Sequence, residues 1–360
     1  MEYLETFAQK LSTINEEGIA YYDLMTDIPF VLYGIHNFSV HSSFDKYPYE
    51  MLDKNSKDVY GALAKSSFER LKNSATSCRL RFKTNSNTII FRIELKRRWS
   101  FLRMNLYNSS GFDVYKKIQG QWVHHTVFGP NEGHSIFAYN MVLPKNTEIM
   151  VFCPNYNEIV NLSIGSKSPV CAINPYEKAL PICFYGNSIT QGAAASRSGN
   201  SYPNIVSRML DSDIYNFSLT GCCQGNIEVA ENLKYLNLSA FVIDYNKNAL
   251  SAEYLKKTHE KFYLKIREYH PNIPIIIMGN IDFFAHKAYE KYEGIIKETV
   301  LNAEARGENT FYIAPHEVLP KNLRQYLSVD ANGHLTEMGM YLLAEKVVDI
   351  LKSAWDNAKK

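Results

Sequence analysis

The chain has 360 residues, of which 46% are hydrophobic and 21% charged, and this composition excludes a disordered protein. Its length exceeds what one ordinary core fills, so two domains are expected. The net charge is only +2, from 39 basic and 37 acidic residues, which gives no electrostatic reason to expect nucleic acid or an anionic membrane as a partner.

The N-terminal residues and the cysteines bear on location. Met1 to Glu5 is acidic and polar and lacks the basic and apolar segments of a signal peptide. No stretch approaches 18 uncharged apolar residues, so no membrane span is expected. The six cysteines have neither zinc-site nor redox-pair spacing. We therefore expect reduced thiols and a cytoplasmic protein, whose oligomeric state the sequence does not define.

The first half of the chain has the period of β-strands. Polar and apolar side chains alternate within residues 78 to 165, and loops rich in Asn, Ser, Gly and Pro separate the stretches. The expected strands are Arg79–Lys83, Phe91–Lys96, Phe101–Leu106, Phe112–Lys116, Ser135–Tyr139, Glu148–Cys153 and Glu158–Ile164. This pattern predicts an antiparallel β-sandwich in an N-terminal domain of residues 1–172. Its leading segment is poorly defined, with Leu63–Leu71 as a short helix or a loop.

After about residue 175 the pattern changes to alternating apolar runs and helical segments. The expected strands are Ile182–Tyr185, Ile214–Phe217, Ala240–Tyr245, Ile273–Met278 and Phe311–Ala314. The expected helices are Tyr202–Leu210, Ile227–Leu236, Ala252–Tyr269, Lys287–Arg306 and a last one from Thr336, as N-cap, to about Ala358. Such alternation predicts a second domain, residues 173–360, with a parallel sheet covered by helices on both faces.

Four loops of the second domain carry residues suited to acyl transfer. Ser188, Gly221, Asn248 and His334 each follow a predicted strand or lie beyond the last one. In parallel α/β sheets ligands gather at the carboxyl ends of the strands, so we expect these loops to meet at one edge. A serine alone after a strand is more often a turn or cap residue, and it is the set that favours catalysis.

The chemistry assigns a role to each member of the set. Ser188 is the candidate nucleophile, and His334 is the base that a serine hydroxyl needs at neutral pH. The backbone N–H groups of Ser188 and Gly221 and the side-chain amide of Asn248 are the candidate oxyanion hole. Asp330 is the nearest carboxylate that could orient His334.

These residues occur in blocks that resemble the SGNH or GDSL hydrolases. The blocks are Tyr185-Gly186-Asn187-Ser188-Ile189-Thr190-Gln191-Gly192, Asn216 to Gly221, Asn246-Lys247-Asn248 and Asp330 to His334. Gly111-Phe112-Asp113-Val114-Tyr115 is similar to the Gly-Xaa-Asp-Leu-Tyr motif in the β domain of one branch of that family. The resemblance implies a flavodoxin-like three-layer α/β domain, an ester substrate, and no metal or organic cofactor.

Two departures from the family pattern affect the site. Asn187 stands beside the serine where the family commonly has aspartate, and we do not interpret it as inactivating. The family aspartate commonly lies three residues before the histidine, a position held here by Ala331, whereas Asp330 lies four before His334. A turn at Gly333 could absorb the extra residue. The alternative is a Ser–His dyad in which a backbone carbonyl holds the imidazole.

The sequence therefore predicts a serine esterase that acts on short-chain, favoured O-acetyl, esters of a carbohydrate or small molecule. An acyltransferase with the same acyl-enzyme, and a non-catalytic glycan-binding protein with a decayed site, are the alternatives. His124, His125, His259 and His316 are expected to be structural or surface residues, since no further ligands occur at zinc spacing. Asp113 and Tyr115 are interpreted as structural.

Overall fold

In the computed structural model, the described residues are 17–34, 62–97, 104–131, 133–281, 283, 287–330 and 332–358. The chain divides into two compact units, with the main boundary between Pro175 and Tyr176. Arg197–Gly199 belongs to the first unit, and α3 (Ala62–Leu71) lies within the second. The sequence analysis predicted a single boundary after residue 172 and did not predict that each unit includes a segment from the other side of it.

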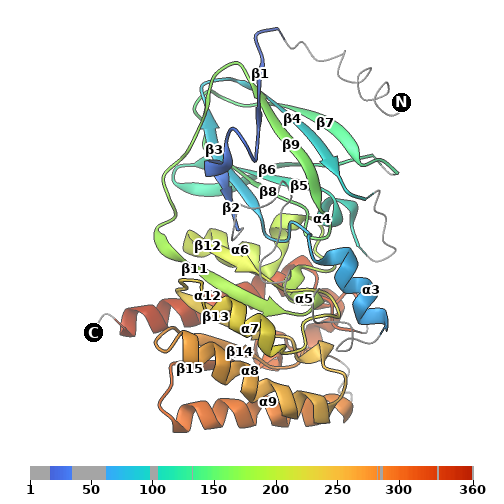
Figure 1. Ribbon diagram of the computed structural model, residues 1–360, viewed down its shortest axis with the longest axis vertical. Helices are drawn as coiled ribbons and strands as arrows, with labels where there is room; N and C mark the ends of the chain where they lie inside the picture. The colour runs from blue at the N-terminus through green and yellow to red at the C-terminus, as the bar shows by residue number, and fades with distance from the viewer. Residues whose placement is uncertain are drawn as a thin grey trace. The chain divides into compact units, whose positions relative to one another are not determined.

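The first unit contains two antiparallel sheets (Figure 1). One sheet has the order β1 (Ala20–Asp23), β9 (Ile159–Ser166), β4 (Thr88–Leu95) and β7 (Ile136–Val142). The other has the order β10 (Val170–Cys171), β3 (Arg79–Thr84), β8 (Ile149–Phe152), β5 (Phe112–Ile118) and β6 (Gln121–Phe128), with β2 (Leu32–Tyr33) beside β3 after the short helix η1 (Pro29–Val31). Buried side chains of both sheets form one core, in which Phe91 of β4 packs against Phe128 of β6. The predicted sandwich is confirmed.

One predicted strand of this unit is wrong where it can be checked. Phe101–Leu106 alternates like a strand, but Asn105 caps the short helix α4 (Leu106–Ser109). The Asn105 side chain accepts a hydrogen bond from the Tyr107 N–H at 2.9 Å. Asparagine offers the backbone this local partner in place of a sheet neighbour, and the period of two does not detect such competition. Phe101 to Arg103 lie outside the described residues.

The second unit is built on a parallel sheet of five strands (Figure 1). The strand order is β12 (Ser212–Asn216), β11 (Lys178–Gly186), β13 (Ala240–Asp244), β14 (Ile275–Met278) and β15 (Thr310–Ile313). The first strand in sequence thus lies between the second and the third. Ligand sites of open parallel sheets lie at the carboxyl ends of the strands where the order reverses, which here is between β11 and β13.

Helices cover both faces of this sheet. The long ones are α6 (Tyr202–Leu210), α7 (Ile227–Leu233), α8 (Ala252–Tyr269), α9 (Lys287–Ala305) and α12 (Glu337–Asn357). The short ones are α5 (Ser188–Gln191), η3 (Ser198–Asn200), η4 (Asn246–Asn248), α10 (Pro315–Val318), η5 (Lys321–Leu323) and α11 (Arg324–Leu327).

The strand residues alternate between the two helix layers. Phe184 of β11 lies in one core with Tyr202 of α6 and Leu343 of α12. Its neighbour Tyr185 points the other way and stacks on Phe262 of α8, with ring centroids 4.6 Å apart. This three-layer arrangement confirms the predicted flavodoxin-like α/β fold.

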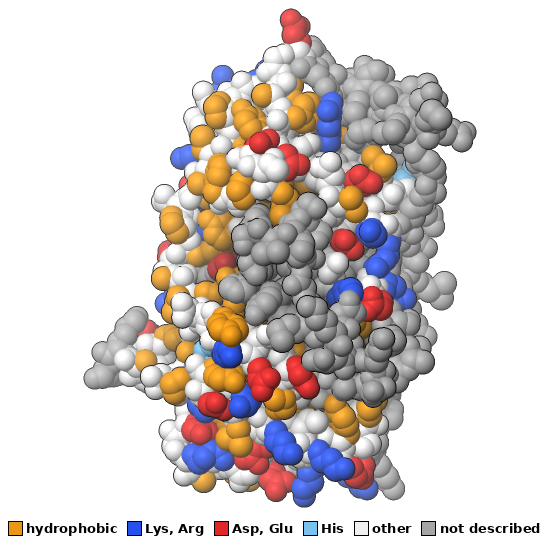
Figure 2. Space-filling view, in the orientation of Figure 1, with side chains coloured by type: hydrophobic (Ala, Val, Ile, Leu, Met, Phe, Trp, Pro, Cys, Tyr) orange, Lys and Arg blue, Asp and Glu red, His pale blue; other side chains and the backbone are white. Residues whose placement is uncertain are grey.

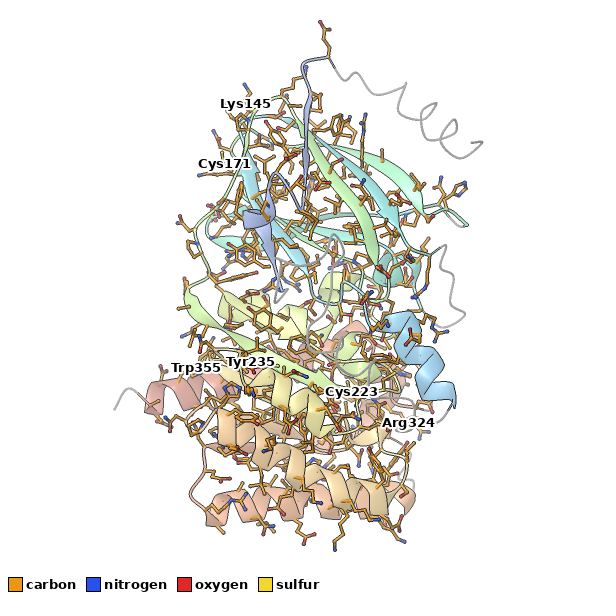
Figure 3. The ribbon with its side chains drawn as sticks, viewed as in Figure 1. Lys145, Cys171, Cys223, Tyr235, Arg324 and Trp355 are labelled. Carbon is orange, nitrogen blue, oxygen red and sulfur yellow. The ribbon has the colours of Figure 1, made fainter. Side chains whose placement is uncertain are left out.

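The surface of the second unit carries both signs of charge. Figure 2 shows Lys, Arg, Asp and Glu side chains interspersed over its helices. Within the described ranges no helix is long and apolar enough to cross a membrane. The same residues contain no His, Cys, Asp or Glu group suited to hold a metal. The six cysteines are all free, with Cys171 exposed and Cys223 buried (Figure 3).

Candidate active site

The candidate nucleophile lies on a tight turn at the carboxyl end of β11. The strand ends at Gly186, and the Asn187 side chain caps α5 by accepting a hydrogen bond from the Ile189 N–H at 2.8 Å. Ser188 is therefore the first residue of α5. Gly192 ends this helix with a left-handed backbone, φ +105°, a conformation that favours glycine. Cap and glycine together fix the helix that begins at Ser188.

Ser188 and His334 are brought together from positions 146 residues apart. The Oγ of Ser188 lies 2.8 Å from Nε2 of His334, and both side chains are partly buried. Nδ1 of His334 lies 2.8 Å from Oδ2 of Asp330. A hydroxyl, an imidazole and a carboxylate thus form one hydrogen-bonded chain, the geometry that activates a serine.

The loop before His334 accommodates its extra residue by a turn. The Gly333 N–H donates to the Asp330 carbonyl at 3.1 Å, and Gly333 has φ +76°. Oδ1 of Asp330 accepts hydrogen bonds from the N–H groups of Asn332 and His334. Ala331 lies outside the described residues. The turn lets a carboxylate four residues before the histidine reach its ring.

These contacts also set the charge of Asp330. Burial alone raises the pKa of this carboxyl, but the hydrogen bonds and charge of His334, with the Asn332 N–H, outweigh it and hold the pKa below its usual value. Asp330 is therefore ionised at neutral pH and can hold the Nδ1–H tautomer of His334, which leaves Nε2 free to accept a proton.

Gly221 and Asn248 lie against one another. Oδ1 of Asn248 accepts a hydrogen bond from the Gly221 N–H at 3.2 Å, and its Nδ2 donates to the Leu219 carbonyl at 3.3 Å. The Gly221 loop is linked to α5 because Gln191 accepts hydrogen bonds from both the N–H and the hydroxyl of Thr220. Gly221 has φ +73°, and nothing lies within 4 Å of the place a Cβ would occupy. The loop is thus open at this residue.

Two residues around the turn escaped the sequence analysis as site residues. Asp244 ends β13 and binds Asn187 and Thr190. The Lys247 Nζ donates to the Asn332 carbonyl at 2.5 Å and so links the Asn248 loop to the His334 loop. Lys247 lies within the Asn246-Lys247-Asn248 block and Asp244 lies two residues before it, and this proximity is the signal that could have found them.

The histidines outside the site divide into buried and surface residues. His259 is buried, and burial lowers its pKa to about 4. Its Nδ1 lies 2.8 Å from the Thr299 hydroxyl, which accounts for it as a neutral structural residue. His125 lies on β6, where burial and the charge of Lys116 lower its pKa.

The Gly-Xaa-Asp-Xaa-Tyr segment of the first unit forms a polar cluster around Asp113. The Asp113 side chain is fully buried, and its Oδ2 accepts hydrogen bonds from the Arg197 Nε at 2.9 Å, the Gly199 N–H at 3.1 Å and the Tyr115 hydroxyl at 3.2 Å. Its Oδ1 lies 3.1 Å from Nε2 of His124. Asp113 thus anchors Arg197–Gly199 within the first unit.

Two family models match successive parts of the chain. The model of the GDSL-like lipase/acylhydrolase family matches residues 179–352, which include the whole Ser188–His334–Asp330 arrangement. Residues 179–352 are thus a GDSL-like lipase/acylhydrolase domain. The model of the N-terminus of SGNH hydro-type esterases, named GxDLY, matches residues 30–170. The resemblance inferred from the sequence blocks is confirmed, and the protein is an SGNH/GDSL-type serine hydrolase.

Solved structures of the same fold include hydrolases and a transferase. A putative GDSL-like lipase from Bacteroides ovatus is 23% identical, with a TM-score of 0.73, and 94% of this chain matches 98% of that one. The salicylyl-acyltransferase SsfX3 from a tetracycline biosynthetic pathway is 14% identical, with a TM-score of 0.72 and coverage of 93% and 97%. A family two carbohydrate esterase from Cellvibrio japonicus is 11% identical, with a TM-score of 0.55 and coverage of 78% and 90%. No curated protein sequence matches the chain closely enough to count as a relative.

Proposed function

We propose that this GDSL hydrolase is a serine esterase that cleaves short-chain acyl esters, foremost O-acetyl groups on a carbohydrate. The observation that carries the proposal is the chain Ser188 Oγ, His334 Nε2, His334 Nδ1 and Asp330 Oδ2, with 2.8 Å at each of its two contacts. The Ser188 hydroxyl attacks the ester carbonyl while His334 takes its proton, and Asp330 stabilises the resulting imidazolium. His334 then protonates the leaving alcohol, and water hydrolyses the acyl-serine.

The tetrahedral intermediate needs donors for its negative oxygen. The N–H of Ser188 at the start of α5, the N–H of Gly221 and the Nδ2 of Asn248 are the proposed donors. Support comes from the hydrogen bonds by which Thr220 holds the Gly221 loop to Gln191 of the nucleophile's own helix. The single Gly221 N–H donates to Asn248 Oδ1 in this structure and would have to turn toward the oxyanion, whereas Nδ2 of Asn248 has a second hydrogen beside the one it donates to Leu219. The missing Cβ at Gly221 leaves room for a substrate to approach.

The carbohydrate part of the proposal is supported by likeness of fold. Several solved structures of similar fold are carbohydrate esterases, among them the Cellvibrio japonicus enzyme and one from Clostridium thermocellum solved with cellohexaose. Fold by itself does not fix substrate, so this part is tested separately. On a panel of acetylated sugars and of short and long acyl esters, we expect preference for acetyl; preference for long chains would contradict it.

Replacement of Ser188 tests the mechanism. A fluorophosphonate probe should label the wild-type protein and not Ser188→Ala, and ester hydrolysis by this variant should fall by at least about 10⁴-fold. Circular dichroism and the unfolding midpoint serve as controls for folding. If a folded wild-type protein resists the probe, the esterase proposal fails, and a binding protein with an inactive cleft becomes the better description.

An acyltransferase is the second candidate, because the salicylyl-acyltransferase fold matches nearly the whole chain. The two activities share the acyl-serine and differ in whether water or an alcohol captures it. Product analysis with and without an added sugar acceptor separates them: acyl transfer to the acceptor in excess of hydrolysis would favour the transferase.

A further inference from the structure

The turn that carries Ser188 rests on a second carboxylate, Asp244, which is 2% exposed at the end of β13. Its Oδ2 accepts a hydrogen bond from the Thr190 hydroxyl at 2.7 Å, and its Oδ1 accepts one from Nδ2 of Asn187 at 3.1 Å. The Asp244 carbonyl accepts two further hydrogen bonds, from the N–H and the Nδ2 of Asn187, at 2.9 and 2.8 Å. Asp244 therefore binds the residues one before and two after Ser188.

Gly186 makes this arrangement possible. A Cβ at this glycine would lie 2.3 Å from the Thr190 hydroxyl and 3.0 Å from the Asp244 carbonyl. The absence of a side chain lets Thr190 fold back over the end of β11 and reach the carboxylate. Tyr202 of α6 completes the chain by donating from its hydroxyl to Thr190 at 3.1 Å, which directs the Thr190 proton toward Asp244.

We propose that Asp244 is a positioning residue for Ser188 and that Asn187 is its matched amide partner. The pair explains why an amide stands beside the serine in this chain. An aspartate at residue 187 would put two carboxylates at hydrogen-bonding distance in a buried place, where they cannot both ionise. One carboxylate and one amide satisfy the same geometry with a single charge. The proposal rests on the proposed nucleophilic role of Ser188.

The electrostatic surroundings make the pair sensitive to pH. Burial raises the pKa of Asp244 to about 7, against the hydrogen bonds from Thr190 and Asn187 and the charge of Lys247 on η4. On the side of α6 the nearest titratable group is Tyr202, whose pKa is raised first by burial and then by Asp244, so this phenol remains a donor. A proton on Asp244 competes with the Thr190 hydrogen bond and releases one side of the turn.

A reciprocal exchange tests the pairing. The four proteins are the wild type, Asn187→Asp, Asp244→Asn and the double variant, compared by their rates of fluorophosphonate labelling. At about pH 8, Asn187→Asp should react about a hundredfold more slowly, because one buried carboxylate must stay protonated or move away. The double variant should recover at least about tenfold of this loss, since it again holds one carboxylate and one amide. The pairing would be overturned if the double variant were labelled no faster than expected from multiplying the rate losses of the two single variants.

The pH profile separates positioning from mere structural support. Below about pH 7 the wild-type labelling rate should fall as Asp244 takes up a proton, whereas Asp244→Asn should lose this part of the pH dependence. Identical profiles for the two proteins would overturn the positioning role.

A milder variant guards against a failure to fold. Asn187→Ser retains a cap for α5 but removes the Nδ2 donor to Asp244, and should slow labelling about tenfold. The matched control is Asn105→Ser, which changes the N-cap of α4 in the first unit and should leave the rate unchanged. Full reactivity of Asn187→Ser would count against the proposal.

Failure of this inference can be told from failure of the proposed function. The free energy of unfolding across the same four proteins measures the Asn187–Asp244 coupling without any reaction at Ser188. If the unfolding free energies show coupling but the wild-type protein resists the probe, the esterase proposal fails and the Asn187–Asp244 pairing stands. If the wild-type protein reacts with the probe but the unfolding free energies show no coupling, the pairing fails and the esterase proposal stands.

Discussion

Each unit of this protein buries an aspartate, and the two carboxylates are stabilised by opposite means. Asp113 in the first unit lies between two basic side chains, Arg197 at 2.9 Å and His124 at 3.1 Å. Asp244 in the second unit accepts hydrogen bonds from Asn187 and Thr190, which are both neutral. Both anchor a short segment of the chain, yet only one of them has a cation as direct partner.

The difference shows that burial alone does not decide whether a carboxylate is charged. A cation at hydrogen-bonding distance compensates for lost hydration, whereas neutral donors compensate only in part. Asp244 accordingly has a pKa of about 7, so its proton can move in the pH range where an esterase works. An ion pair suits a structural anchor, whereas neutral donors around a buried carboxylate allow it to titrate near neutral pH.

The largest expected effect is the pH dependence that Asp244 gives to stability. Its pKa in the folded protein, about 7, lies above the usual 3.8, so the folded state holds this proton more tightly than the unfolded one. The resulting stability is fully present below about pH 4 and is lost as pH rises through about 7. Between about pH 5 and pH 8, the wild type should lose about 2–3 kcal/mol relative to Asp244→Asn, measured by urea unfolding. If the difference in unfolding free energy between the wild type and Asp244→Asn stayed constant across this range, Asp244 would not have a raised pKa.

Removal of Asp113 should have an effect of similar size. Asp113→Ala leaves Arg197, whose side chain is 25% exposed, without its buried partner, and should destabilise the protein by about 3 kcal/mol. The control is Lys117→Met on the same strand, which breaks a part-exposed ion pair with Glu148 and should cost less than about 1 kcal/mol. Equal losses of unfolding free energy in Asp113→Ala and Lys117→Met, measured in urea, would show that the Asp113 cluster is not an anchor.

A smaller effect is expected where the Asp113 cluster meets the backbone. A Cβ at Gly199 would lie 2.5 Å from the Asp113 Oδ2 and 2.9 Å from the Tyr115 hydroxyl, so Gly199→Ala should destabilise by about 1–3 kcal/mol.

The smallest effect should be the matched control, Gly294→Ala on α9. It meets nothing within 4 Å and should stabilise the protein by up to about 1 kcal/mol through helix propensity. Thermal unfolding should show a lower midpoint for Gly199→Ala and a higher midpoint for Gly294→Ala. Loss of stability in both variants would point to a general intolerance of alanine.

Most of the second unit could be predicted because its strands and helices have distinct periods. Tyr202–Leu210 and Ala252–Tyr269 have the same bounds in the sequence prediction and in the structure. The Leu106 helix was missed because its cap is a local hydrogen bond, and the α10, η5 and α11 turns are too short to show a period. The role of His124 beside Asp113 also escaped, because a bulge opposite Val114 and Tyr115 sets which residue faces the carboxylate.

The sequence by itself determined the fold class, the family and the candidates Ser188, Gly221, Asn248, His334 and Asp330, because patterns and motifs are local properties of a chain. Only the tertiary structure decided that the Asp330 carboxylate reaches His334, that Asp244 supports the turn of Ser188, and that Asp113 anchors Arg197–Gly199. Each of these depends on the positions of atoms carried by different segments. Hydrogen bonds require those atoms to lie within about 3 Å, and no spacing along the sequence encodes that distance.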